Sequence, residues 1–169
     1  ESQISDFEEL FLDRLKMASD WLFRIQETDW NMPPIIDSLT GRIVRQIDWP
    51  RLAFAAWALA EFCKIIRKEK YIQAAEKSYE YLKRFLIPNS QSIIRGYELT
   101  LAYFGQLSFC LGKPNDAATA ADIIIGRLHA LDFEPITFAQ IASFFKVVSR
   151  NDPRFYVLLE ELLRIVKEE

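Results

Sequence analysis

The fold is decided by PRLAFAAWALAEFCKIIR at residues 50–67, KEK at 68–70 and YIQAAEKSYEYLKRFL at 71–86. The first segment is Ala-rich and apolar nearly all round, which is typical of a helix buried between neighbours. The last segment separates an apolar face from a charged face at helical spacing, which is typical of an outer, amphipathic helix. Because the turn between them is short, the two helices are expected to be antiparallel neighbours.

The rest of the chain continues this pattern of helices joined mostly by short loops. Helices are predicted at about 6–27, 92–111, 116–130, 136–149 and 153–167, which with the central pair makes about seven. The sequence therefore predicts an all-α fold of antiparallel hairpins in a single domain spanning residues 1–169. The chain starts with Glu1 rather than Met, which is compatible with a fragment of a larger protein.

Local signals support several of these boundaries. Ser5 and Glu8 have the form of a capping box, and Asp48 with Pro50 predicts the start of the central helix. Gly112 suits the position just after a helix. In the first helix, apolar residues fall on one stripe at helical spacing: Phe7, Leu10, Phe11, Leu15, Ala18, Trp21, Leu22 and Ile25.

Residues 28–49 break the helical pattern and form the longest predicted non-helical segment. Pro33 and Pro34 cannot sit inside a helix. The Ile35–Ile36 and Ile43–Val44 pairs predict two short extended pieces around a Gly turn. Long loops in helical domains are often functional, so this segment is the first place to look for a site.

Composition limits the classes of partner. The 169 residues are 50% hydrophobic, with a net charge of −3 and no basic block, so a nucleic-acid footprint is not indicated. No apolar run reaches the ~20 residues that a membrane span needs. Cys63 and Cys110 lie in apolar helical runs and are expected to be free thiols, which favours a reducing, cytoplasmic location.

The sequence contains no strong catalytic or metal motif. His129 is the only histidine, and with two separated cysteines it does not make a zinc site. No G-x-S-x-G elbow, Gly-rich phosphate loop or H-E-x-x-H pair is present. We therefore predict no metal and no cofactor, assign no catalytic residue and leave open whether the protein is an enzyme.

The long loop supplies the candidate ligand-binding residues. Trp30 and Trp49 flank it, and either indole offers a flat apolar face on which a sugar ring could stack. Asp37 and Asp48 could bind hydroxyls or act as acid and base, as paired carboxylates do in glycoside chemistry. Arg42 could bind a carboxylate or phosphate. The structural alternative is that Asp48 caps a helix, Asp37 starts a turn and the tryptophans cover the core edge.

Two further carboxylates lie inside apolar helices. Glu98 is a candidate binding residue because a buried carboxylate is costly unless paired, and such groups often mark sites. Glu61 has the same character. The ordinary explanation is a local ion pair, of Glu98 with Arg95 and of Glu61 with Lys64, each three residues apart.

Residues 21–86 resemble one hairpin and its loop from an (α/α)-toroid of the six-hairpin glycosidase and epimerase kind. The residues that carry this resemblance are Trp21-Leu22, Asp37, Gly41, Ala55-Ala56-Trp57-Ala58-Leu59, Lys70-Tyr71 and Ala74-Ala75. It implies a partial toroid in which loop aromatics and carboxylates are presented to a sugar. A second, weaker resemblance, to tetratricopeptide-like repeats, is carried by Phe104-Gly105, Gly112 and Ala117.

Two functions follow as hypotheses. The first is a helical domain that handles a carbohydrate or similar polar ligand as part of a larger enzyme or complex. It predicts that Trp30, Asp37, Asp48 and Trp49 border one concave pocket. The second is a non-catalytic helical-repeat module that binds a protein partner. It predicts an extended groove or an exposed apolar patch.

Overall fold

The computed structural model is all-α apart from one small pair of strands, and it describes residues 2–25, 35–36, 39–40, 43–44, 48–89, 96–127, 135–150, 152–157, 159–160 and 164. The elements are α1 (Ser2–Ile25), β1 (Ile35–Ile36), β2 (Ile43–Val44), α2 (Trp49–Ile66), α3 (Glu69–Leu86), α4 (Tyr97–Cys110), α5 (Pro114–Arg127) and α6 (Pro135–Val148). Residues 154–157, 159–160 and 164 are also helical, within the segment predicted as the last helix.

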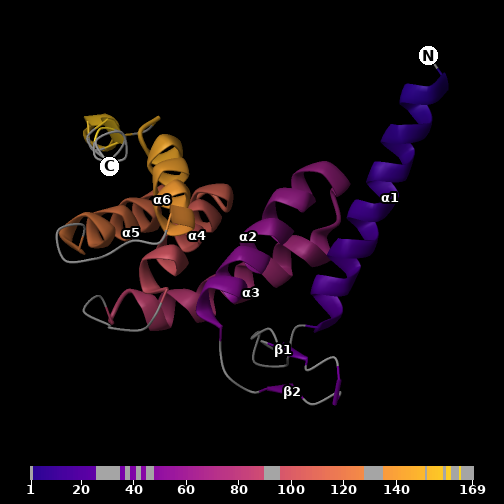
Figure 1. Cartoon of the computed structure of the whole chain (residues 1–169), viewed down its shortest axis with the longest axis horizontal. Coiled ribbons are helices and arrows are strands. Elements are labelled where there is room, and N and C mark those ends of the chain that lie inside the picture. Colours follow the sequence, from indigo (N-terminus) through magenta and orange to yellow (C-terminus); the bar gives the residue numbers. More distant parts are fainter. Residues whose placement is uncertain are drawn as a thin grey trace.

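Helix α4 is the centre of the arrangement, because it contacts α2, α3, α5 and α6. Helices α2 and α3 form the predicted hairpin and lie side by side (Figure 1). Helix α1 contacts α2 and α3 with one end and extends beyond them toward the N-terminus (Figure 1). The predicted order of helices is therefore confirmed, and the long apolar helices are the ones at the centre.

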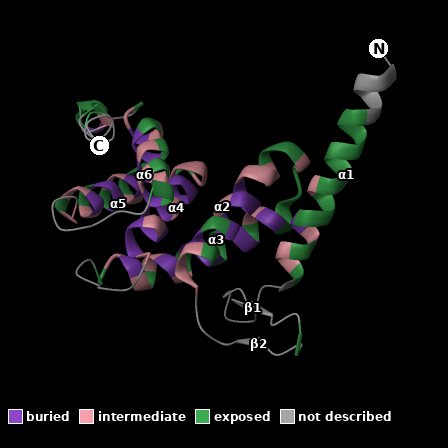
Figure 2. Cartoon of the chain, viewed as in Figure 1, coloured by how far each residue is buried: buried purple, intermediate pink, exposed green. Residues whose placement is uncertain are grey.

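The core is built from residues of α2, α3, α4, α5 and α6, and Figure 2 shows the buried residues of these helices in purple. As predicted, α2 buries most of its surface, and α3 buries one face through Tyr71, Ala75, Tyr79, Leu82 and Leu86. Burying an apolar side chain of this size contributes about 1.5–3 kcal/mol, which is the main favourable term in folding.

Gly105 allows α4 and α6 to approach closely. A Cβ atom at this position would overlap the ring of Phe144, which is fully buried. Gly112 has a different role. Its φ of +71° lies in the left-handed region, and the Lys113 N–H donates to the Ser108 carbonyl at 2.8 Å. This confirms the predicted helix end at Gly112.

Several predicted boundaries were wrong by a few residues. Helix α1 begins at Ser2, so Ser5 lies inside the helix and not at its N-terminal boundary. Helix α4 begins at Tyr97, after Gly96 with its φ of +75°. Helix α5 begins at Pro114, because proline lacks only an N–H that the first helical turn does not use.

The two short extended pieces are confirmed. Strands β1 and β2 pair antiparallel, with Ile35 opposite Val44 and Ile36 opposite Ile43. Among the described residues, no helix is both long and apolar enough to cross a membrane.

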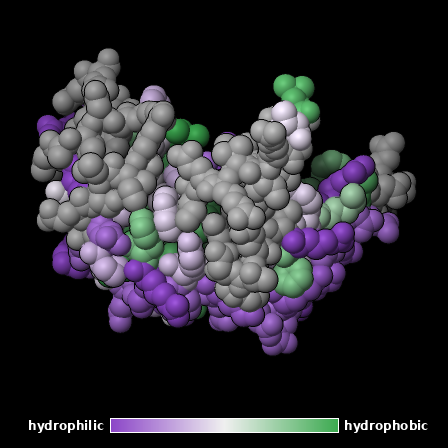
Figure 3. Space-filling view, turned by 90° about the horizontal axis from the view of Figure 1, so that it is seen from below, coloured by the Kyte–Doolittle hydropathy of each residue, from purple (hydrophilic) through white to green (hydrophobic). Residues whose placement is uncertain are grey.

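The apolar stripe of α1 is split between two environments. Leu15 and Leu22 are partly buried, whereas Phe7, Leu10 and Trp21 are exposed. Figure 2 shows α1 as largely green, in contrast to the purple core. Seen from below, the coloured part of the molecule is hydrophilic along its lower edge, with hydrophobic residues in separate areas (Figure 3).

Candidate functional site

An open groove of about 360 Å³ lies where the first turn of α2 meets the first two turns of α4. Its volume falls within the range of small-ligand sites. The lining is mostly apolar and includes one predicted site residue, Asp48. The lining residues are Asp48, Pro50, Arg51, Phe54, Leu99 and Tyr103.

The geometry of the two helix starts shapes this groove. Asp48 caps α2 as predicted, since its Oδ1 accepts a hydrogen bond from the Arg51 N–H at 3.1 Å. Gly96 precedes α4 in a left-handed conformation, and a Cβ atom there would lie 2.9 Å from Pro50 Cγ. Glycine therefore lets the start of α4 lie against the start of α2, which brings Leu99 and Tyr103 opposite Phe54.

Aromatic rings form one wall of the groove. The ring centroids of Phe54 and Tyr103 are 5.3 Å apart at 67°, and those of Trp57 and Tyr103 are 5.9 Å apart at 26°. Phe54 is 48% exposed, although its neighbours Ala53 and Ala55 on α2 are buried. Burial raises the pKa of Tyr103, so its hydroxyl stays protonated at neutral pH and can donate a hydrogen bond.

An ion pair stands at one end of the groove. Arg51 Nε lies 3.1 Å from Asp48 Oδ2, and the two side chains are 65% and 30% exposed. Each carboxylate oxygen can accept more than one hydrogen bond, so Asp48 can cap the helix and still bind a ligand hydroxyl. Asp48 is the single carboxylate among the described lining residues, and an acid–base pair for glycoside cleavage needs two.

The Trp49 side chain lies outside the groove and packs on α3. Its ring stacks on Phe85 of α3, with centroids 3.7 Å apart at 7°, and lies 5.8 Å from the ring of Tyr81. It is partly buried against the core and is not among the groove residues. This arrangement matches the structural interpretation of Trp49. Its role in ligand binding stays a prediction.

Three of the predicted binding residues lie outside the described residues: Trp30, Asp37 and Arg42. Arg95, the expected partner of Glu98, and His129 lie outside them as well. Of the four residues predicted to share one pocket, only Asp48 and Trp49 are described. Asp48 lines the groove, whereas Trp49 stacks on Phe85.

Glu98 has a partner that local spacing did not predict. Arg127 Nε on α5 donates to Glu98 Oε1 on α4 at 2.6 Å, and the two side chains are only 19% and 10% exposed. The Arg127 guanidinium also lies 5.1 Å from the centre of the Tyr97 ring. The pair joins two helices, and neither residue lines the groove. By contrast, Glu61 pairs with Lys64 at 2.9 Å, as predicted.

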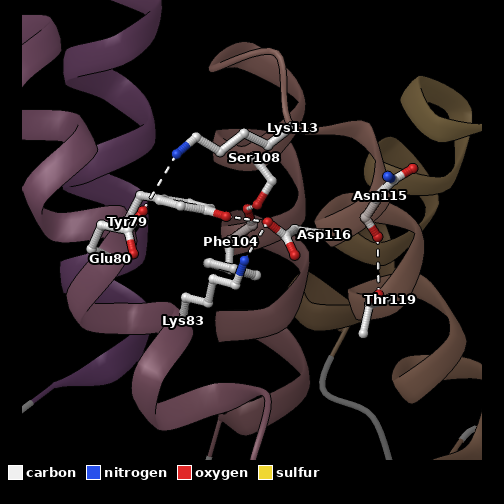
Figure 4. Close-up of polar contacts among 9 residues, drawn as sticks. All are labelled: Tyr79, Glu80, Lys83, Phe104, Ser108, Lys113, Asn115, Asp116 and Thr119. Atoms are coloured by element: carbon white, nitrogen blue, oxygen red, sulfur yellow. Dashed lines mark hydrogen bonds and ion pairs between the residues drawn. The ribbon is translucent and has the colours of Figure 1, made fainter.

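A polar cluster joins α3 to the start of α5 (Figure 4). Tyr79 and Lys83 both donate hydrogen bonds to Asp116 Oδ2, Lys83 at 2.9 Å. Burial acts to raise the pKa of Asp116, but these two hydrogen bonds outweigh it and lower the pKa. Burial and the bond to Asp116 raise the pKa of Tyr79 to about 12. Lys113 lies 4.1 Å from the centre of the Tyr79 ring.

A matching cluster joins α3 to α1. Tyr71 donates to Asp20 Oδ1 at 2.7 Å, and Lys70 donates to the same oxygen. The bonds from Lys70 and Tyr71 lower the pKa of Asp20 to about 2. Each cluster consists of one tyrosine and one lysine of α3 and one aspartate of a second helix, α1 or α5. Holding these helices together is a sufficient explanation for both clusters.

The two cysteines are free thiols, as expected, and both are partly buried. Burial, with a smaller contribution from nearby Glu61, raises the pKa of Cys110 to about 11. A thiol in this state is a poor nucleophile at neutral pH. Among the described residues, no group of three or more His, Cys, Asp or Glu side chains could hold a metal ion.

Sequence reasoning missed most of the groove. Phe54 and Tyr103 lie in apolar helices, where an aromatic residue looks like part of the core. Arg51 lies in the first turn of α2, and its spacing of three residues from Asp48 was the available signal for the ion pair.

Comparison with protein-family models, curated proteins and solved structures gives no match to this chain. The resemblances to (α/α)-toroids and to tetratricopeptide-like repeats therefore stay predictions.

Proposed function

We propose that the chain is a helical domain that binds a carbohydrate in the groove between α2 and α4, as part of a larger enzyme or complex. The observation that carries this proposal is the combination of an aromatic wall, Phe54 and Tyr103, with the Asp48–Arg51 pair at one end. The apolar face of a sugar ring fits against aromatic rings, while its hydroxyls need hydrogen-bond partners. Both features lie within one open groove of suitable volume.

The proposal assigns a role to each group. Phe54, Leu99 and Tyr103 supply apolar contact, and the Tyr103 hydroxyl adds a donor. Asp48 accepts hydrogen bonds from sugar hydroxyls. Because the carboxylate is charged, these bonds are stronger than bonds between neutral groups. Pro50 and Gly96 hold the two helix starts together, so the groove exists before the ligand arrives.

A saccharide screen read out by melting temperature tests the proposal. A ligand present at about 100 times its Kd stabilises the folded state by about 2.7 kcal/mol, which raises Tm by roughly 5 °C or more. Phe54→Ala is expected to weaken binding about tenfold or more, since one ring contact is lost. Asp48→Asn keeps a good helix cap but removes the charge, so binding weakens while the fold is retained.

Tyr156→Ala is the matched control, because Tyr156 is 55% exposed and lies outside the groove. Binding that is equally weakened by Tyr156→Ala, or unchanged by Phe54→Ala and Asp48→Asn, would place the ligand elsewhere and reject the groove.

A further inference from the structure

Arg51 is the more exposed member of the ion pair at the end of the groove. Its side chain is 65% exposed, against 30% for Asp48. Among the described lining residues, Arg51 is the one base and Asp48 the one acid. A guanidinium carries five N–H donors and no acceptor, whereas a carboxylate only accepts. The groove therefore offers a ligand two opposite kinds of polar partner, a donor at Arg51 and an acceptor at Asp48.

Arg51 stands where a basic residue does little for the stability of α2. It lies in the first turn of the helix, which contains no acidic residue. The start of a helix carries a partial positive charge, so a cation there is unfavourable and an anion is favourable. The pair with Asp48 is exposed, and exposed pairs contribute little to stability. Residues that break a local rule in this way are expected at functional sites.

The Arg51 guanidinium is held in place beside the aromatic wall. Arg51 and Phe54 are three residues apart on α2, so they lie on the same side of the helix, and both line the groove. Arg51 Nε lies 3.1 Å from Asp48 Oδ2, which fixes one edge of the guanidinium before a ligand arrives. A ligand carboxylate on the opposite edge would be about twice as far from Asp48 as from Arg51, so attraction exceeds repulsion.

We propose that the ligand of this groove is an acidic sugar, a hexuronate, and that Arg51 is the residue that selects it. This inference rests on the proposed carbohydrate site. The C6 carboxylate of a hexuronate projects from the edge of a ring whose C–H face can lie against Phe54 or Tyr103. The carboxylate binds Arg51, and a ring hydroxyl donates to Asp48. A neutral hexose supplies the hydroxyl for Asp48 but no charge for Arg51.

Isothermal titration calorimetry of the whole chain with matched saccharides tests this selection. The probes are the methyl glycosides of glucose, galactose and mannose, the corresponding hexuronates, and the methyl esters of those acids, which keep the shape but remove the charge. At least one hexuronate is expected to bind about fivefold more tightly than its ester and its neutral parent, the value of a well-formed exposed ion pair. Added salt should reduce this difference, because it screens exposed charges.

Substitutions of Arg51 assign the preference to this residue. Arg51→Gln is expected to remove the preference for the acid while binding the neutral parent as wild type does. Arg51→Lys should keep part of it, because lysine retains the charge but not the planar fork of donors. The cap on α2 uses the Arg51 backbone N–H, so it is available in both variants. Arg150→Gln is the matched control, because Arg150 is exposed and lies outside the groove, and it should keep the full preference.

The outcomes separate this inference from the proposed function. A neutral sugar that binds as tightly as its hexuronate, or a preference that persists in Arg51→Gln, would overturn the inference and leave the carbohydrate site standing. If none of the saccharides binds, the proposed function fails and the inference fails with it.

Discussion

Arg127 donates a hydrogen bond to Glu98 at 2.6 Å, and this largely buried ion pair fastens α5 to the central helix α4. Both charges are mostly removed from water, so the Glu98 carboxylate relies on Arg127 to offset its loss of hydration. Glu98 lies two residues after Gly96, which lets the starts of α2 and α4 approach, and directly before the groove residue Leu99. The first turn of α4 therefore contributes both to the groove and to the ion pair.

Removing one partner of this pair is expected to be costly. Arg127→Met should lower the free energy of unfolding by about 3 kcal/mol, because it leaves the Glu98 carboxylate buried without its partner. Replacing both residues, with Glu98→Met and Arg127→Met, should recover much of this loss. Urea denaturation of the single and double variants measures both values. A double variant less stable than Arg127→Met would contradict the explanation.

Gly105 is expected to tolerate no side chain. Gly105→Ala forces its new methyl group into the Phe144 ring, and overpacking of this kind costs about 1–3 kcal/mol. Adding Phe144→Leu should relieve the clash and recover part of the stability. Gly126→Ala is the control, since a Cβ atom there meets nothing within 4 Å, and it should leave stability unchanged or raise it by up to about 1 kcal/mol. Thermal unfolding compares the four proteins.

Acid should weaken the attachment of α1. The pKa of Asp20 is lowered from 3.8 to about 2 by its bonds to Lys70 and Tyr71. A carboxyl group with a lowered folded-state pKa stabilises the fold above its ordinary pKa, and the effect is lost as pH falls toward the folded-state value. Asp20→Asn should therefore be less stable than wild type near about pH 6, and the difference should shrink as pH falls below about 4 and vanish only below about pH 2.

Urea titrations at a series of pH values measure this convergence. Asp13→Asn serves as the control, because Asp13 lies on the same helix and its ion pair with Lys16 is exposed. A difference between Asp20→Asn and wild type that stays constant down to about pH 2 would contradict the role of the Asp20 charge.

Cys110 should resist alkylation. Its pKa of about 11 leaves roughly a hundredfold less thiolate at neutral pH than an ordinary cysteine has. Iodoacetamide is expected to modify Cys110 about a hundred times faster in the urea-unfolded chain than in the folded one, as followed by peptide mass spectrometry. Equal rates in the two states would show that the thiol is not held as the structure shows.

Local patterns predicted the parts of the fold that depend on neighbouring residues. Asp48 caps α2, Gly112 follows α4, and the pairs Ile35–Ile36 and Ile43–Val44 form strands, as their sequences indicated. These features are set by backbone conformation and by hydrogen bonds within a few residues. The all-α class followed in the same way from helical periodicity.

Long-range contacts were not predictable in this way. Glu98 pairs with Arg127, 29 residues away, and such a partner follows only from the packing of α4 on α5. Periodicity identified the apolar stripe of α1 but could not show that much of it faces solvent. Phe54 and Tyr103 could not be predicted as groove residues for the same reason, since an aromatic residue in an apolar helix can face the core or its edge.

The most direct test of the carbohydrate proposal is a backbone amide chemical-shift map of the isotope-labelled chain during titration with the saccharides that raise Tm. We predict shift changes concentrated at residues 48–54 and 99–103, on the two helices that line the groove, and their loss in Phe54→Ala. Shift changes centred on other residues, or none at all, would contradict binding in the groove.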